Sequence, residues 1–90
     1  MANPAPITLT PLKTIRSHAG IARFYAECDG TEAPDYIGTI PRQPIPSPYA
    51  YSPTHAVYRH HGQPVIVVET SHKVYAVFVV HGPIGPREEG

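Results

Sequence analysis

Two apolar runs near the C-terminus restrict the fold more than any other feature of the sequence. They are residues 65–68 (VIVV) and 74–80 (VYAVFVV), and the polar residues 70–73 (TSHK) lie between them. β-Branched and aromatic side chains fit the surface of a pleated sheet, and a short polar break lets the chain turn in water. The pattern therefore predicts an antiparallel hairpin over residues 65–80.

A third strand precedes this hairpin. Residues 55–59 read as a strand, residues 60–62 as a turn, and Pro64 suits the first position of the next strand. We therefore expect a three-stranded meander over 55–59, 64–69 and 74–80. Turns at His61-Gly62 and Ser71-His72 would place Tyr58 opposite Val65 and Val65 opposite Phe78.

That register makes both faces of the meander apolar. A sheet with one solvated face carries polar residues on that face, so this sheet needs cover on both sides. One face would carry Ala56, Tyr58, Val65, Val67, Val74, Ala76, Phe78 and Val80, and the other Val57, Ile66, Val68, Tyr75, Val77 and Val79. Residues 7–28 can cover one face. The other face needs a proline-rich segment of this chain or another protein.

Residues 11–30 allow two interpretations. As a helix, Thr10 is the N-cap, Pro11 the first helical residue and Asp29-Gly30 the stop. As a hairpin, residues 17–20 form the turn, and residues 21–28 form a strand with alternate residues facing inward. We favour the hairpin, because the sequence downstream is β and Gly20 suits a turn. The expected fold is thus mainly β, a small antiparallel sheet or barrel-like domain completed by strands from 7–40. The alternative is α+β, with one helix at 11–28 packed on the sheet.

Residues 31–54 form a proline-rich arm, since six of the twelve prolines lie between positions 34 and 53. Such a segment is stiff and loses little entropy when it docks. Its PxxP match at 41–44 is weak in so proline-rich a stretch. Tyrosine and arginine are enriched at interface hot spots, so we expect partner binding through Tyr36, Arg42, Tyr49 and Tyr51. Alternatively, the arm folds over its own sheet and Tyr49 and Tyr51 belong to the core.

Composition bounds the remaining possibilities. Ninety residues make one domain, which we divide into an extended leader (1–6), the arm (31–54), the meander (55–80) and a flexible tail (81–90). Seven basic and seven acidic residues give no net charge, which disfavours nucleic acid as a partner. A single cysteine, no signal-peptide pattern and no apolar run of ~20 residues predict a protein that is neither exported nor membrane-spanning. We expect it in the cytoplasm or within a virion or other assembly.

The sequence contains no recognisable catalytic or metal motif, and we expect no enzyme activity, cofactor or metal. Adjacent histidines on a strand point to opposite faces, so His60 and His61 could share an ion only if the turn twists them together. We interpret the histidines of the meander as solvated turn and rim residues. Cys28 lies beside Asp29, whose carboxylate disfavours an activated thiolate.

Three functional hypotheses remain. The leading one is a non-catalytic protein-interaction or structural subunit of a larger assembly, of which a capsid-decoration or cement protein is one example. It rests on the neutral charge, the proline-rich arm and the two apolar faces of the sheet. The alternatives are a small inhibitor of one enzyme or nuclease, and a weak nucleic-acid-binding module that uses Lys13, Arg16, Arg23, Arg42 and Arg59.

Overall fold

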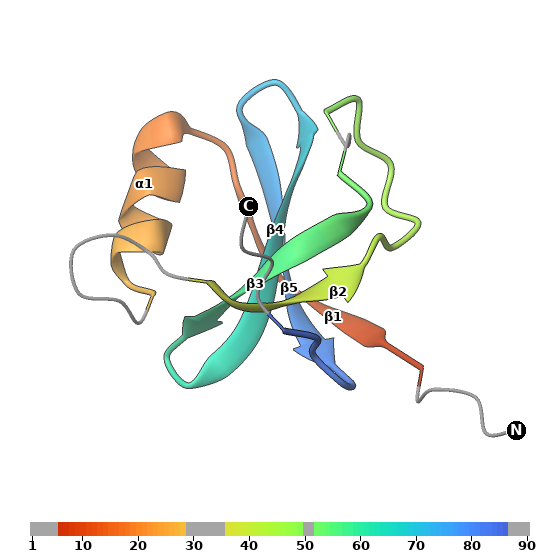
Figure 1. Ribbon diagram of the computed structural model, residues 1–90. Coiled ribbons are helices and arrows are strands. Elements are labelled where there is room, and N and C mark those ends of the chain that lie inside the picture. Colours follow the sequence, from red (N-terminus) through yellow and green to blue (C-terminus); the bar gives the residue numbers. More distant parts are fainter. Residues whose placement is uncertain (1–5, 29–35, 50–51, 87–90) are drawn as a thin grey trace, which may run out of the picture.

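A five-stranded antiparallel sheet dominates the computed structural model, which describes residues 6–28, 36–49 and 52–86. The strand order is β1-β5-β4-β3-β2, and a single short helix accompanies the sheet in the described ranges (Figure 1). The elements are β1 (Thr8–Ile15), α1 (His18–Ala26), β2 (Tyr36–Pro41), β3 (Thr54–His60), β4 (Gln63–Ser71) and β5 (Val74–His81). The mainly β fold and the C-terminal β3-β4-β5 meander are therefore confirmed.

The register of the meander was predicted correctly at one turn and wrongly at the other. Tyr58 lies opposite Val65, as expected for a turn at His61-Gly62. Val65, however, lies opposite Val79 rather than Phe78. The β4–β5 turn is at His72-Lys73, where Lys73 has φ 62°, and the register shifts between Glu69 and Ser71. Compared with the predicted register, β5 is displaced by one residue relative to β4. Each β5 side chain therefore lies on the face opposite to the predicted one.

Both faces of the meander are apolar, as the pattern predicts, and each has its own core cluster. On one face, α1 packs on strands β3 to β5, and the buried residues are Ile21, Phe24, Cys28, Val65, Val77 and Val79. On the other face, the buried residues are Ile40, Val57, Ile66, Val68 and Val80. Because of the shifted register, Val77 and Val79 lie on the same face as Val65, whereas the predicted register placed them on the same face as Ile66.

The hairpin that we favoured for residues 7–28 is wrong. Residues 8–15 are a strand that pairs with β5, and the chain then forms a helix from His18. Ser17 caps this helix, since its hydroxyl accepts a hydrogen bond from the Gly20 backbone N–H at 2.9 Å. A Cβ at Gly20 would lie 2.8 Å from the Ile15 side chain, so this glycine permits a close approach between helix and strand. The helical alternative was right in type but began too early, because 11–15 belong to β1.

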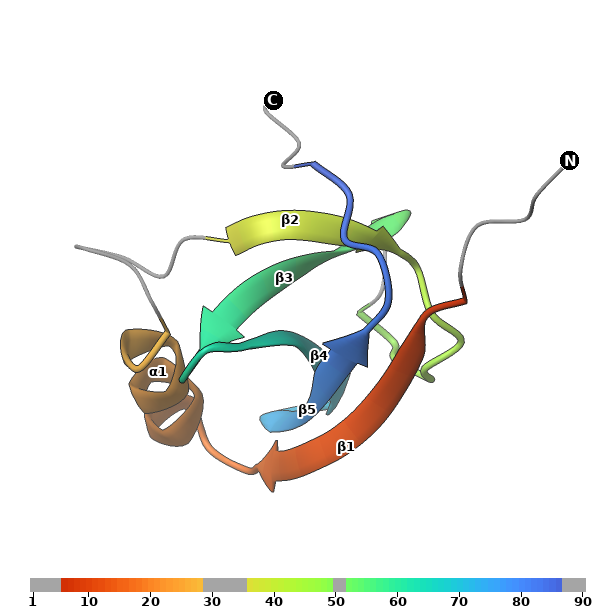
Figure 2. The same ribbon diagram turned by 90° about the horizontal axis from the view of Figure 1, so that it is seen from below.

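The chain supplies its own cover for the second face of the sheet. Half-buried side chains pack there from β1, from β2 and the rest of the arm, and from the segment after β5, among them Leu9, Ile37, Ile45 and Ile84. The sheet is strongly curved, and the segment after β5 crosses toward β2 (Figure 2). Gly85 exchanges two backbone hydrogen bonds with Thr39 of β2, at 2.7 and 3.1 Å. The first residues of the predicted tail thus belong to the folded structure.

Strand β3 separates from β4 partway along its length. Only Tyr58, Arg59 and His60 pair with β4, whereas the earlier residues of β3 pair with β2. A gap therefore opens between the first half of β3 and the second half of β4. None of the helices in the described ranges is long and apolar enough to cross a bilayer.

Candidate functional site

After β2, the arm crosses the gap between β3 and β4, and Arg42 fixes the start of this crossing. The Arg42 backbone N–H donates to the Pro53 carbonyl at 3.0 Å. Its side chain donates from Nε to the Ser52 carbonyl at 2.8 Å and from Nη2 to the Thr54 carbonyl at 3.2 Å. One guanidinium thus binds the strand-entry segment through several donors, a role for which its rigid fork geometry is suited.

His55 lies beneath this arginine and is buried, with 5% of its surface exposed. The backbone N–H of Gln43 donates to His55 Nε2 at 3.1 Å, which requires a neutral ring with the proton on Nδ1. Burial, and then the neighbouring Arg42 cation, lower the pKa of His55 from 6.5 to about 4. His55 is therefore a neutral buried histidine that accepts a bond from the arm.

The second part of the arm is fixed on β4. The Ser47 hydroxyl donates to the Glu69 carbonyl at 2.5 Å and accepts from the Tyr49 backbone N–H at 3.2 Å. Between the two attachment points lies a half-open pocket of about 240 Å³, here called the arm pocket. Its lining consists of Arg42, Ser47, Tyr49, Thr54, His55, Ala56, Val67, Val68 and Glu69.

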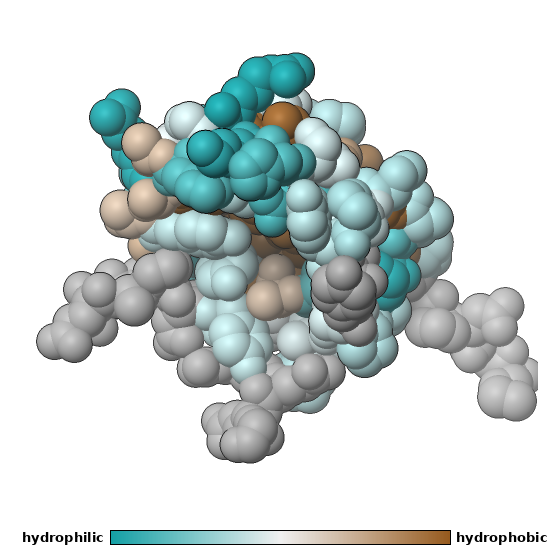
Figure 3. Space-filling view, turned by 90° about the horizontal axis from the view of Figure 1, so that it is seen from above, coloured by the Kyte–Doolittle hydropathy of each residue, from teal (hydrophilic) through white to brown (hydrophobic). Residues whose placement is uncertain are grey.

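Polar and apolar groups both contribute to the arm pocket. Arg42 and Glu69 bring opposite charges, while valine and alanine side chains of the diverging strands supply apolar surface. Tyr49 is 45% exposed. The face that includes the β4–β5 turn is mostly hydrophilic, with apolar surface visible in small areas between polar side chains (Figure 3).

The structure brings two of the four predicted partner-binding residues together. Arg42 and Tyr49 both line the arm pocket. Tyr36 lies at the start of β2 opposite Tyr58 and is not part of that lining. Tyr51 lies outside the described residues. Sequence reasoning missed His55 and Glu69, which join the arm residues only because β3 and β4 diverge.

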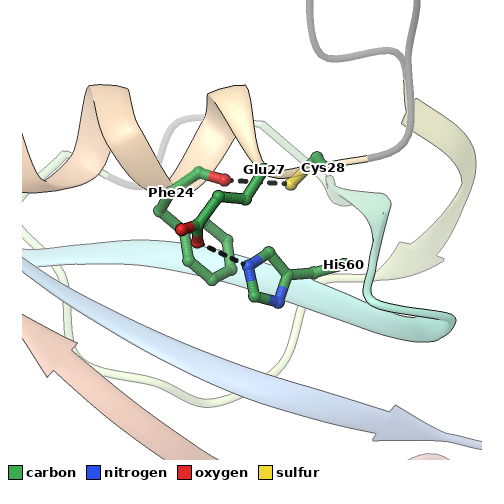
Figure 4. Close-up of polar contacts among 4 residues, drawn as sticks. All are labelled: Phe24, Glu27, Cys28 and His60. Atoms are coloured by element: carbon green, nitrogen blue, oxygen red, sulfur yellow. Dashed lines mark hydrogen bonds and ion pairs between the residues drawn. The ribbon is translucent and has the colours of Figure 1, made fainter.

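A second group of polar side chains gathers where α1 meets the β3–β4 turn. His60 is 6% exposed, and its ring stacks on Phe24 with centroids 4.2 Å apart and an interplanar angle of 14°. Its Nε2–H donates to Glu27 Oε1 at 3.1 Å (Figure 4). The prediction that the meander histidines are solvated is wrong for His55 and His60, because the arm covers one and α1 covers the other.

His61 completes this group. Its φ of 49° turns its ring toward that of His60, and the centroids lie 4.2 Å apart. One potential ligand atom each from Glu27, His60 and His61 lies within 4.8 Å of the others. The hydrogen bond from His60 lowers the pKa of Glu27 most, and electrostatic interactions with His60, His61 and Lys13 lower it further, against a smaller opposing effect of desolvation. The turn therefore twists the two adjacent histidines toward each other, and the end of the helix adds a carboxylate that no sequence spacing rule could find.

Cys28 follows α1 and is buried in the first core cluster. Its thiol donates to the Phe24 carbonyl at 3.5 Å (Figure 4). These contacts are typical of a structural cysteine that packs as a small apolar residue.

Comparison of the chain with protein-family models, with curated proteins and with solved structures finds no match.

Proposed function

We propose that the protein is a non-catalytic interaction subunit of a larger assembly and that it binds its neighbour at the arm pocket. The observation that carries this proposal is the position of Tyr49, a large and exposed side chain on a pocket that also contains Arg42. Interfaces derive most of their binding energy from a few tyrosine, tryptophan and arginine side chains and from anchors that fill pockets.

Within the arm, residues 42–49 are already held in place for such a contact. Arg42 donates to the carbonyl of Thr54 in β3, and Ser47 donates to the carbonyl of Glu69 in β4. A surface that is fixed before binding loses less conformational entropy when a partner docks. A pocket of about 240 Å³ has room for one side chain of a neighbouring subunit rather than for a large ligand.

The two apolar faces of the sheet no longer support this proposal, because α1 covers one and the chain's own segments cover the other. Strand β1, at one edge of the sheet, offers a competing surface. Leu12 lies on the edge strand β1 and is 41% exposed. Strand β1 contains a proline, a register shift and a lysine in succession, which are features that protect edge strands from pairing with other chains. We therefore place the contact at the arm pocket.

The experiment compares Tyr49→Ala with Leu12→Ala. Association is measured by sedimentation velocity over a range of protein concentrations, with the chain alone and with proteins that copurify with it. We expect Tyr49→Ala to weaken association about tenfold or more while the thermal stability stays close to that of the wild type. Leu12→Ala, which removes an equally exposed apolar side chain elsewhere, should leave association unchanged. A wild-type chain that stays monomeric and retains no partner would refute the proposal.

A further inference from the structure

We propose that Glu27, His60 and His61 form a binding site for one divalent transition-metal ion, with zinc as the preferred metal. The site lies at the junction of α1 with the β3–β4 turn, and it is separate from the arm pocket. The three side chains come from two elements, and their nearest ligand atoms lie within 4.8 Å of one another.

The donor set matches the known preferences of zinc. Two imidazole nitrogens and one carboxylate oxygen form a three-ligand set of the kind that leaves a fourth tetrahedral position for water. Imidazole ligands select against magnesium and calcium, which prefer oxygen alone. Copper and nickel also bind imidazoles, so the donor set selects a class of transition metals rather than one metal. Within that class we name zinc, because zinc ions are the more available in cells.

The distance between two of the three ligand atoms already suits a zinc ion. Two ligand atoms that each lie about 2.1 Å from a tetrahedral zinc ion are roughly 3.4 Å apart. His60 Nε2 and Glu27 Oε1 are 3.1 Å apart and share a proton that a metal ion would replace. Phe24 fixes the His60 ring by stacking on it. Glu27 and His61 are both exposed, so their side chains can turn toward the ion and water can reach it.

A purely structural role explains only part of this arrangement. The hydrogen bond between His60 and Glu27 fastens α1 to the sheet, and that role needs no third residue. His61 contributes nothing to that bond, yet it occupies a left-handed position with φ 49°, followed by Gly62 with φ 80°. Asparagine is preferred at the first position of such a two-residue turn. A histidine at position 61 therefore costs some stability, and it places a third ligand beside His60 and Glu27.

Occupancy would join α1 to the β3–β4 hairpin through the ion. The free-energy gain follows from mass action, because an ion that binds only the folded chain stabilises it. The site is therefore expected to bind zinc and to raise the thermal stability of the domain.

The test is a calorimetric titration of the metal-free full chain with zinc chloride. We expect one zinc ion per chain and a rise in melting temperature. His61→Asn removes a ligand and supplies the residue that the turn prefers, so the variant should fold at least as well as the wild type. Its zinc affinity should fall by about a hundredfold or more, since even the loss of a second-shell partner costs ~10–100-fold. Glu27→Gln keeps a hydrogen-bond acceptor for His60 and should also weaken binding.

His72→Asn is the matched control. His72 is an exposed histidine in the β4–β5 turn, and its ring lies 6.4 Å from that of His18. This variant should bind zinc as the wild type does. The proposal is overturned if the wild type binds no zinc at micromolar concentration, if His61→Asn binds it equally well, or if His72→Asn is the variant that loses binding.

Discussion

The guanidinium of Arg42 lies over the imidazole ring of His55. Its Nη1 is 3.1 Å from Nδ1 and 3.4 Å from Nε2, and such nearly equal distances place the nitrogen above the ring rather than in line with one lone pair. The in-line acceptor position at Nε2 belongs to the Gln43 backbone N–H. A proton on that nitrogen would remove this bond and set two positive charges face to face. The contact between arm and sheet therefore requires a neutral His55.

Acid should weaken the fold through His55. Its pKa is about 4 in the folded chain and 6.5 when unperturbed, so the unfolded chain binds more protons between these values. The stabilisation is complete above pH 6.5 and is lost as the pH falls toward 4. A shift from 6.5 to about 4, at about 1.4 kcal/mol per unit, corresponds to roughly 3 kcal/mol. Urea unfolding at pH 7 and at pH 4.5 measures how much of this stabilisation is lost.

The control for this prediction is His55→Gln, which has no group that titrates in the window. This variant should be less stable than the wild type at pH 7, and its stability should change less between pH 7 and 4.5. Equal pH slopes for the two proteins would contradict the assignment. Below about pH 4.5 both should lose further stability, because the pKa of Glu27 is also lowered from 4.5.

Arg42→Lys should loosen the arm although it conserves the charge. Arg42 donates from Nε to one carbonyl and from Nη2 to another while Nη1 lies on His55. A lysine ammonium cannot reproduce this fork, so about 1–3 kcal/mol of stability should be lost. Amide hydrogen exchange should speed up in the arm, at Gln43 and Tyr49, more than in the core strand β4. Uniform acceleration across the sheet would instead indicate a global loss of stability.

The extent to which the fold follows from the sequence depends on how local each signal is. The β3–β4 turn was predictable because Gly62 marks a two-residue turn with positive φ. The β4–β5 turn was placed one residue too early, since residues 70–73 contain neither glycine nor asparagine and Lys73 takes the left-handed position. The choice between helix and hairpin at 11–28 depended on the pairing of residues 8–15 with β5, a contact between opposite ends of the chain.

The same limit applies to the candidate sites. Arg42 and Tyr49 could be named from residue type within the arm, but His55 and Glu69 join them only through the divergence of two strands. His60 and His61 were visible as a pair in the sequence. Glu27 was not, because it lies 33 residues from His60 and no spacing rule covers a helix packed on a distant turn.

Gly38→Ala should disrupt the closure of the sheet by the C-terminal segment. A Cβ at this position would lie 2.2 Å from the Gly85 carbonyl oxygen and 2.6 Å from the Ile84 side chain. Backbone must move to relieve such contacts, so we expect a loss of about 1–3 kcal/mol in chemical unfolding. Gly85→Ala is the control, because its Cβ would come no closer than 3.3 Å to Thr39 and φ there is not positive. A larger loss in Gly85→Ala than in Gly38→Ala would contradict the packing described here.

Lys73→Gly should stabilise the protein. Lys73 has φ 62° at the end of the β4–β5 turn, a conformation that costs a residue with a Cβ about 1–2 kcal/mol and glycine nothing. The greater freedom of glycine in the unfolded chain offsets part of this, so we expect a net gain of up to about 1 kcal/mol. The backbone N–H of residue 73, which donates to Glu69 Oε2 at 3.3 Å, is retained. His72→Gly is the control, because His72 does not have a positive φ, and this variant should lose a similar amount of stability. Urea unfolding measures both variants. If both substitutions changed stability in the same direction, the cause would be a general effect of glycine in the turn and not the φ of Lys73.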